Sequence, residues 1–246
     1  MEPIYTKHIT IDNSRVDCFG RMRPSMLLYI AQEMGSAHGT LMSVGYDILA
    51  SKNLFWAVSR HRAEITRMPM TGETIRVETW PLPPTRSAYP RSVIAYDEEG
   101  NECFRVITLW VLMTLDSRRM ITPGKSGITV DGTIRGNELT VPGGLILRPA
   151  ASTSRRTVTF TDIDRNGHMN NTRCMDWLAD LLPSEFHRSH ELRELTVCYL
   201  AEARERNELL LNLEFSEDNV AQLDATREDN GDSHRIFSAK MFYEHV

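Results

Sequence analysis

The sequence predicts an α+β fold built from two tandem copies of one unit, each an antiparallel sheet with one long helix. In the first copy, residues 27–41 carry apolar side chains at helical spacing, and the segments after them alternate as strands do. The same order of strand, polar loop, helix and strands recurs after residue 150. The two loops also align, because residues 16–23 and 163–170 share an Asp, a Gly and a Met at equal spacing. One helix followed by several antiparallel strands, found twice, is the α+β pattern.

The first copy is predicted to open with a strand and one long helix. Residues 4–10 have strand composition, and residues 12–23 form a polar connection. Pro24 suits the first position of a helix, where its missing N–H leaves no bond unmade. The helical stripe continues to Gly45, so one face of the helix should be buried. Strands are expected after it at 54–65, 74–80, 87–96 and 102–115.

A stretch rich in glycine and proline, residues 124–150, separates the two copies. We therefore divide the chain into an N-terminal domain (1–130), a linker (131–150) and a C-terminal domain (151–246). In the second copy a helix is predicted from Thr172 to Leu182. Strands are predicted there at 154–160, 194–203, 208–215, 220–227 and 234–243.

The composition is that of a soluble globular protein. Of 246 residues, 41% are apolar and 25% are charged. No apolar run approaches the roughly 18 residues of a membrane span, and the net charge of −5 argues against an extended nucleic-acid surface. Four cysteines without C-x-x-C spacing suggest free thiols in a reducing compartment. With no signal-like segment at the start, we expect a cytoplasmic protein that binds neither nucleic acid nor membrane.

Reactive side chains gather on the loop before the second helix, at Asp164, Asn166 and His168. A histidine with an unperturbed pKa of about 6.5 exchanges protons at neutral pH, and an asparagine amide can donate to a developing oxyanion. Asn170 or Asn171 can cap the helix, whose N-terminal N–H groups then face the loop. The helix N-terminus therefore suits a carbonyl oxygen that becomes negative.

The first copy of the loop lacks two of these side chains. Phe19 and Arg21 stand where the second copy has Asn166 and His168, although the Asp is kept. One active site per chain is therefore expected, in the second copy. The first copy is left to supply a pocket wall or a partner surface.

Metal and serine chemistry fit the sequence poorly. Residues 162–167 look like the start of a calcium-binding EF-hand loop, but its twelfth position needs a bidentate Glu and holds Arg173. His187 and His190 lack a further ligand at metal-site spacing and are expected to be solvated. There is no G-x-S-x-G elbow and no phosphate-binding G-x-x-x-x-G-K-S/T loop. We expect neither a metal nor a cofactor.

Residues 162–171, with the sequence D-I-D-R-N-G-H-M-N-N, resemble the signature D-x-D-x-N-x-H-x-N-N of the acyl-acyl-carrier-protein thioesterases. Residues 195–202 resemble the following strand of that family with its glutamate, and residues 108–119 resemble a strand of its first half. The resemblance thus covers most of the chain. It implies a double hotdog fold, in which each half wraps an antiparallel sheet around a central helix. It also implies hydrolysis of fatty acyl-carrier protein to free fatty acid, which ends chain elongation.

The resemblance implies catalytic roles for four residues: Asp164, Asn166, His168 and Glu202. Glu202 and His168 would deprotonate water, and Asn166 would hold the thioester. Asp164 would act either as an orienting carboxylate or as a nucleophile, and the sequence leaves both open. Family members often have a cysteine after this glutamate, but Ala203 excludes such a nucleophile here. Two other cysteines have apolar neighbours and are expected to pack in the core: Cys174 and Cys198.

The implied partner is an acidic acyl carrier protein, which predicts a basic docking surface. The candidate arginines form three clusters: Arg60, Arg62 and Arg67; Arg118 and Arg119; Arg155 and Arg156. The resemblance also implies a homodimer. Six side chains of the first copy could line an acyl channel or form plain core: Met26, Leu27, Ile30, Met34, Phe55 and Trp56.

Three other functions stay open at this point. A hotdog thioesterase acting on acyl-coenzyme A would share the loop, and a hotdog 3-hydroxyacyl dehydratase would use a histidine and a carboxylate. A non-catalytic acyl-binding module is disfavoured because Asn166, His168 and Glu202 occur together. The acyl chain length and the choice between carrier protein and coenzyme A cannot be read from the sequence.

Overall fold

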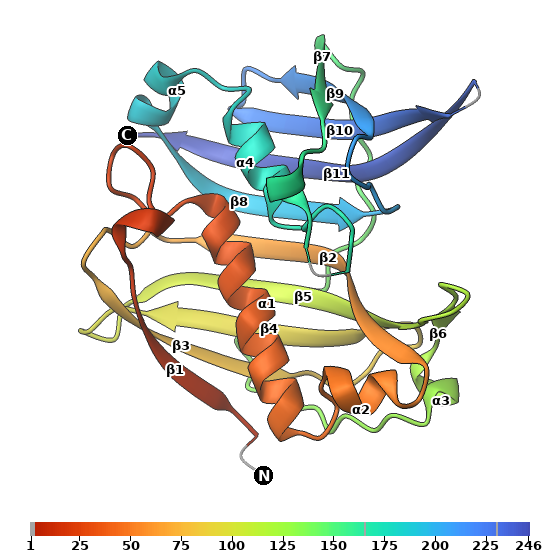
Figure 1. Cartoon of the computed structure of the whole chain (residues 1–246). Coiled ribbons are helices and arrows are strands. Elements are labelled where there is room, and N and C mark those ends of the chain that lie inside the picture. Colours follow the sequence, from red (N-terminus) through yellow and green to blue (C-terminus); the bar gives the residue numbers. More distant parts are fainter. Residues whose placement is uncertain (1–2, 165, 230) are drawn as a thin grey trace. The chain divides into compact units, whose positions relative to one another are not determined.

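The computed structural model describes residues 3–164, 166–229 and 231–246 (Figure 1). Arg165, in the polar loop, lies outside the described residues. The chain forms two compact units, Met1–Pro142 and Gly143–Val246. Each unit holds an antiparallel sheet and helical segments, so the predicted repeat of one α+β unit is confirmed. The limits of the linker at 131–150 stay a prediction.

The sheet of the first unit is antiparallel and has the strand order β1-β3-β4-β5-β2. The first and last residues of these five strands agree with the predicted segments to within two residues. The strands are β1 (Tyr5–Thr10), β2 (Leu54–Ile65), β3 (Thr74–Pro81), β4 (Tyr89–Tyr96), β5 (Glu102–Thr114) and the short β6 (Met120–Ile121), which pairs with β5.

One long helix, α1 (Pro24–Leu41), lies across a face of this sheet (Figure 1). Leu27, Ile30 and Met34 are at most 1% exposed, so these residues of the predicted stripe form plain core. Their burial removes apolar surface from water and holds α1 against the strands. The helix therefore gains its stability from packing more than from its caps, since its N-cap side chain makes no capping hydrogen bond.

The helix ends at Leu41, four residues before the predicted Gly45. Ser43 has a φ of 59°, a left-handed conformation through which a right-handed helix cannot continue. Among the helices that the structure describes, none is long and apolar enough to cross a membrane. Three short helical segments of this unit were not predicted: η1 (Asn13–Arg15), α2 (Tyr46–Ala50) and α3 (Pro123–Ser126).

A row of buried polar side chains crosses the sheet beneath α1. Arg91 donates to His38 Nδ1 at 3.0 Å and to Thr79 Oγ1 at 3.3 Å, while His61 contacts Thr108 Oγ1 at 2.9 Å. Burial lowers the pKa of Arg91 to about 10 and that of His61 to about 3. At neutral pH the guanidinium is therefore charged and the imidazole of His61 is neutral. The row fixes α1 on the sheet by polar contacts as well as by packing.

The sheet of the second unit has the order β8-β11-β10-β9-β7 and is also antiparallel. Trp177 and Leu178 of its first helix are fully buried. The elements are β7 (Ser152–Thr157), η2 (Phe160–Asp162), α4 (Arg173–Ala179), α5 (Ser184–Ser189), β8 (His190–Tyr199), β9 (Glu208–Phe215), β10 (Val220–Asp229) and β11 (Asp232–His245).

Three elements of the second unit differ from their predicted extents by three or four residues at one end or at both. The helix α4 spans seven residues and ends at Ala179, because the next residues form a turn before Pro183, which lacks an N–H. The predicted strand at 154–160 ends at Thr157, and η2 follows it. The strand β8 lies four residues closer to the N-terminus than predicted. With these bounds, the polar loop lies between η2 and α4 in the chain.

Candidate active site

The polar loop before α4 is a tight hairpin. Ile163 and Met169 pair across its base, and Asp164 N–H donates to His168 O at 2.9 Å. At the tip, Gly167 N–H donates to Asp164 O at 3.0 Å, and Gly167 has a φ of 79°. A residue with a Cβ atom is strained in that left-handed region, which explains why a glycine occupies this position. The hairpin therefore fixes the backbone at Asp164 and His168 with respect to each other.

The carboxylate of Asp164 faces Asn166 within the loop. Its Oδ1 accepts the backbone N–H of Asn166 at 2.8 Å, and its Oδ2 lies 3.5 Å from the Asn166 amide nitrogen. Asn166 is exposed, and Asp164 is half-buried. The contacts suit a carboxylate that orients the amide of Asn166 toward solvent and an incoming ligand.

His168 and Glu202 form a close pair of titratable groups at the loop. His168 Nε2 lies 2.8 Å from Glu202 Oε2, with the histidine side chain 11% exposed and the glutamate 41% exposed. A carboxylate on one ring nitrogen fixes the orientation and tautomer of the imidazole and leaves the other nitrogen for proton transfer. The structure thus brings together the two residues to which the sequence analysis assigned water activation, although their roles stay a prediction.

Two contacts position Glu202 beside the loop. The backbone N–H of Met169 donates to Ala203 O at 2.8 Å, which joins the loop to the turn after β8. Arg227 of β10 donates to Glu202 O at 3.3 Å and to Asn207 Oδ1 at 3.1 Å. The sequence analysis missed Arg227, because a lone arginine in a strand pattern carries no signal of this contact.

Asn170 and Asn171 have different surroundings. Asn170 Oδ1 accepts the N–H and the hydroxyl of Thr172, each at 2.9 Å, so its side chain caps the turn into α4. The Asn171 carbonyl accepts the Tyr199 hydroxyl at 2.9 Å and the Cys174 thiol at 2.9 Å. The oxyanion role predicted for this turn stays a prediction, and the side chain of Asn170 is already engaged.

The buried cysteines of this unit are packed. Burial raises the pKa of the Cys174 thiol to about 12, although a contact with the Tyr199 hydroxyl at 3.7 Å acts in the opposite direction. The thiol is therefore protonated at neutral pH and is a poor nucleophile. Cys198 is 3% exposed and contacts Gly143 O at 3.8 Å. Both contacts agree with the packing role that the sequence analysis assigned.

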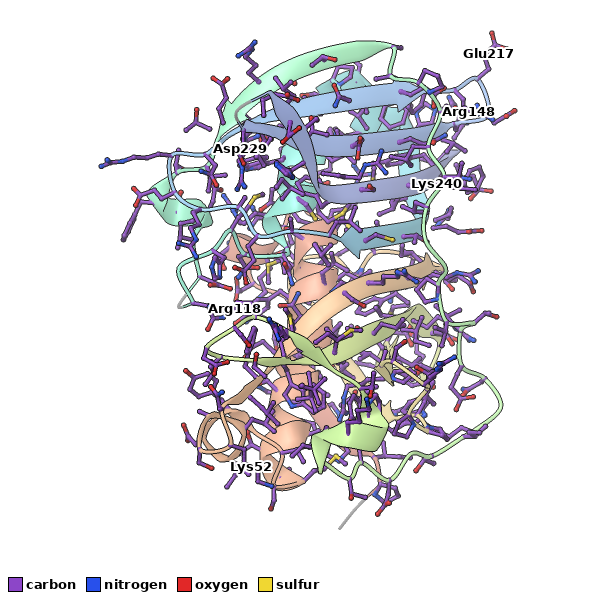
Figure 2. All side chains as sticks on the ribbon, turned by 90° about the vertical axis from the view of Figure 1, so that its right-hand side faces the viewer. Lys52, Arg118, Arg148, Glu217, Asp229 and Lys240 are labelled. Atoms are coloured by element: carbon purple, nitrogen blue, oxygen red, sulfur yellow. The ribbon has the colours of Figure 1, made fainter. Side chains whose placement is uncertain are left out.

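Several arginines of the predicted docking clusters are paired with carboxylates. The pairs are Arg62 with Glu64 at 2.9 Å, Arg67 with Glu73 at 2.8 Å, Arg155 with Glu208 at 2.6 Å, and Arg156 with Asp180 at 2.7 Å. Arg60 donates to Pro142 O at 3.0 Å. Arg118 (Figure 2) lies 4.7 Å from the Phe55 ring centroid and is exposed, as is Arg119. Which of the three clusters docks an acidic partner stays a prediction.

His187 and His190 are half-buried, whereas the sequence analysis expected a solvated pair. His187 Nε2 contacts Ala179 O at 2.9 Å, and the His190 ring stacks on Phe186 with a centroid distance of 4.2 Å. Aromatic packing of α5 onto the sheet explains their burial. Among the described residues, no cluster of three or more His, Cys, Asp or Glu side chains has the arrangement of a metal site.

The chain is similar to plant thioesterases along much of its sequence. A palmitoyl-acyl carrier protein thioesterase of Gossypium hirsutum is 26% identical over 163 residues, which cover 63% of this chain and 40% of that protein. An oleoyl-acyl carrier protein thioesterase of Arabidopsis thaliana is 25% identical over 198 residues, which cover 72% of this chain and 54% of that protein. The chain therefore matches only about half of the length of these relatives, or less.

Solved structures share the fold of the whole chain. An acyl-ACP thioesterase from Bacteroides thetaiotaomicron matches with a TM-score of 0.87 and 23% identity over 98% of both chains. The 12:0-ACP thioesterase from Umbellularia californica matches with a TM-score of 0.83 and 19% identity over 100% of this chain and 99% of that one. These likenesses confirm the double hotdog fold that the sequence resemblance implied.

Two family models cover most of the sequence. Residues 2–123 match the acyl-ACP thioesterase N-terminal domain, and residues 148–240 match the acyl-ACP thioesterase C-terminal domain. The second match contains the loop with Asp164, Asn166 and His168 and also contains Glu202. Because the two matches together span well over half of the sequence, the chain belongs to the acyl-ACP thioesterase family.

Proposed function

We propose that this protein hydrolyses the thioester of a fatty acyl-ACP and releases a free fatty acid, which ends chain elongation. The observation that carries the proposal is the 2.8 Å contact between His168 Nε2 and Glu202 Oε2 beside the loop of Asp164 and Asn166. The arrangement supplies a base for water and an amide for the substrate. The membership of the chain in the acyl-ACP thioesterase family supports the choice of substrate.

His168 and Glu202 act together on the attacking water. Glu202 orients the imidazole through Nε2, and the ring accepts a proton from water as the oxygen attacks the thioester carbon. The carbon–sulfur bond then breaks, and the same proton passes to the departing thiolate. A thiol has a pKa of only about 8.5, so the leaving group needs little acid assistance. The products are one carboxylic acid and one free thiol, with one water consumed.

Asn166 holds the thioester, and backbone donors near α4 stabilise the oxyanion. The Asn171 N–H has no hydrogen-bond acceptor in the described part of the chain and is half-buried, so it is a suitable donor. Asp164 serves as the orienting carboxylate. Both of its oxygens already contact Asn166, which favours this role over a nucleophile that forms a transient anhydride.

The proposal includes an acidic acyl carrier protein as partner and a cytoplasmic homodimer as the working form. The candidate docking clusters for this partner are Arg60, Arg62 and Arg67; Arg118 and Arg119; and Arg155 and Arg156, of which Arg118, Arg119 and Arg155 are exposed. The four cysteines are free thiols, in keeping with a reducing compartment.

The test is an assay of the purified protein with acyl carrier proteins and acyl-coenzyme A esters of several chain lengths. We expect release of free thiol and of an equal amount of fatty acid, with the carrier-bound substrates preferred. Faster turnover of coenzyme A esters would replace the proposal with an acyl-CoA thioesterase. An enoyl product without thiol release would indicate a dehydratase, and binding without turnover would indicate an acyl-binding module.

A further inference from the structure

Asp162 stands at the entry to the proposed catalytic loop, and its carboxylate is buried. The residue is 3% exposed. Its Oδ2 accepts the backbone N–H and the hydroxyl of Thr159, each at 2.9 Å. Its Oδ1 accepts Arg173 Nε at 3.0 Å and Trp177 Nε1 at 3.4 Å. One carboxylate therefore joins the segment before the loop to the helix after it.

The backbone of Asp162 closes the loop at its base. Its N–H donates to Thr159 O at 3.0 Å, and its carbonyl accepts Asn170 N–H at 2.8 Å. The residues between Asp162 and Asn170 include Asn166 and His168, both in the proposed site. If Asp162 moved relative to α4, the side chains of Asn166 and His168 would therefore move with it as a group.

The first unit repeats these backbone contacts without the buried carboxylate. Arg15 N–H donates to Asp12 O at 3.0 Å, and Arg15 O accepts Arg23 N–H at 3.0 Å. The side chain of Arg15 pairs with Asp12 at the surface, at 3.2 Å. The closed loop base thus forms with an arginine at this position, so the carboxylate of Asp162 is not required for the backbone shape of the loop.

We infer that Asp162 is a positioning residue, whose carboxylate locks the loop onto α4 and so sets the placement of Asn166 and His168 relative to Glu202. The inference rests on the proposed function, because it concerns the reaction of that site. Misplacement of reacting groups by about 1 Å can lower a rate about 10²-fold. Burial alone would raise the pKa of Asp162, but hydrogen bonds from Thr159 and Arg173 lower it overall, so the carboxylate is charged at neutral pH.

The experiment compares Asp162→Asn with Asp176→Asn in steady-state hydrolysis of an acyl-ACP. Asp176 is a matched control, because it binds the same Arg173 at 2.7 Å and, among the described residues, its side chain has no hydrogen bond or ion pair with residues 163–170. We expect kcat of Asp162→Asn to fall about 10- to 10²-fold with KM changed less than about twofold. Asp176→Asn should keep kcat within about threefold. Equal losses in the two variants, or an unchanged kcat in Asp162→Asn, would overturn the inference.

A second variant and a second readout keep the test independent of folding and of turnover. Trp177→Phe removes one donor to Asp162 while it keeps a ring in the core, and it should lower kcat less than Asp162→Asn does. In ¹⁵N-labelled protein, the His168 Nε2–H proton held by Glu202 should exchange faster in Asp162→Asn and remain unchanged in Asp176→Asn. An unchanged signal in both variants would also overturn the inference. If the wild-type protein released no thiol, the proposed function would fail, and the proton signal would still decide the role of Asp162.

Discussion

The two copies of the polar loop share a backbone and differ in chemistry. Asp17 N–H donates to Arg21 O at 2.8 Å, as Asp164 N–H donates to His168 O at 2.9 Å. The glycines are equivalent too, since Gly20 has a φ of 77° and Gly167 has a φ of 79°. The Asp and Gly that recur in both copies are thus the residues that the hairpin itself requires.

The likeness extends to the strand that follows each helix. In both units the Met after the loop donates its N–H at 2.8 Å to a carbonyl beyond that strand: Met22 to Pro69, and Met169 to Ala203. The residue before this acceptor is Met68 in the first unit and Glu202 in the second. The first copy therefore has Phe19, Arg21 and Met68 where the second has Asn166, His168 and Glu202. A backbone suited to the site survives there without the groups that would react.

The largest expected loss of kcat comes from changes to His168 and Glu202, the proposed general-base residues of the second copy. Glu202→Gln and His168→Ala should each lower kcat by about 10²- to 10⁴-fold, the range for loss of a general base. The counterparts Met68→Gln and Arg21→Ala should leave kcat within about threefold. Steady-state thiol release from acyl-ACP measures all four variants. A similar loss at Met68 or Arg21 would mean that the first loop also takes part in the reaction.

Asn166→Ala should lower kcat by about 10²-fold, the usual size for loss of a donor to the thioester or its oxyanion. Phe19→Ala is the counterpart in the first copy and should leave kcat unchanged. Thiol release from acyl-ACP is measured for both variants, and thermal unfolding checks that both are folded. A folded Asn166→Ala variant with a normal rate would remove Asn166 from the site.

The sequence could point to those parts of the candidate site that lie together in the chain. Asp164, Asn166 and His168 share one loop, and the loss of two of them in the first copy pointed to a single site. Glu202 came only from the family resemblance, because a hydrogen bond between Met169 and Ala203 brings it to the loop across a long sequence separation. No local pattern records a backbone contact of that kind.

Other features were missed for the same physical reason. The buried contact of Arg91 with His38 joins a strand to α1, and neither residue stands in a motif. The four hydrogen bonds to the Asp162 carboxylate come from Thr159, Arg173 and Trp177, and only the capping-box spacing of Thr159 and Asp162 could have been read from the sequence. Strand extents in the first unit were predictable to within two residues because alternation of apolar residues is local, whereas β7 and β8 of the second unit were displaced by three or four residues.

The two loop glycines should separate folding from function. Gly20→Ala and Gly167→Ala each force a side chain into the left-handed region, where the strain is about 1 kcal/mol in unfolding free energy. A Cβ at Gly167 would meet nothing within 4 Å, and one at Gly20 would meet only ordinary contacts at 3.6 and 3.7 Å. Urea unfolding should thus give similar losses, whereas kcat should fall about 10-fold in Gly167→Ala alone. Equal kcat in the two variants would contradict a single catalytic copy.

The smallest effect concerns the carboxylates at the two loop entries. The pKa of Asp162 is lowered because hydrogen bonds from Thr159 and Arg173 outweigh burial, which acts in the opposite direction. The pKa of Asp12 is lowered chiefly by its hydrogen bond with Ser14. A folded pKa below the unfolded value of about 3.9 stabilises the folded state above that pH, and the stabilisation is lost as pH falls through the folded pKa.

As the pH falls below about 5, the unfolding free energy of the wild type should therefore decrease, and each carboxylate should contribute to the slope. Asp162→Asn should flatten this acid limb more than Asp12→Asn does, because Asp162 is buried against Arg173 while solvent screens Asp12. Urea unfolding at several pH values measures both variants. If Asp12→Asn flattened the acid limb as much as Asp162→Asn does, the buried carboxylate would be bound no better than the exposed one. The two loop entries would then differ less than their contacts indicate.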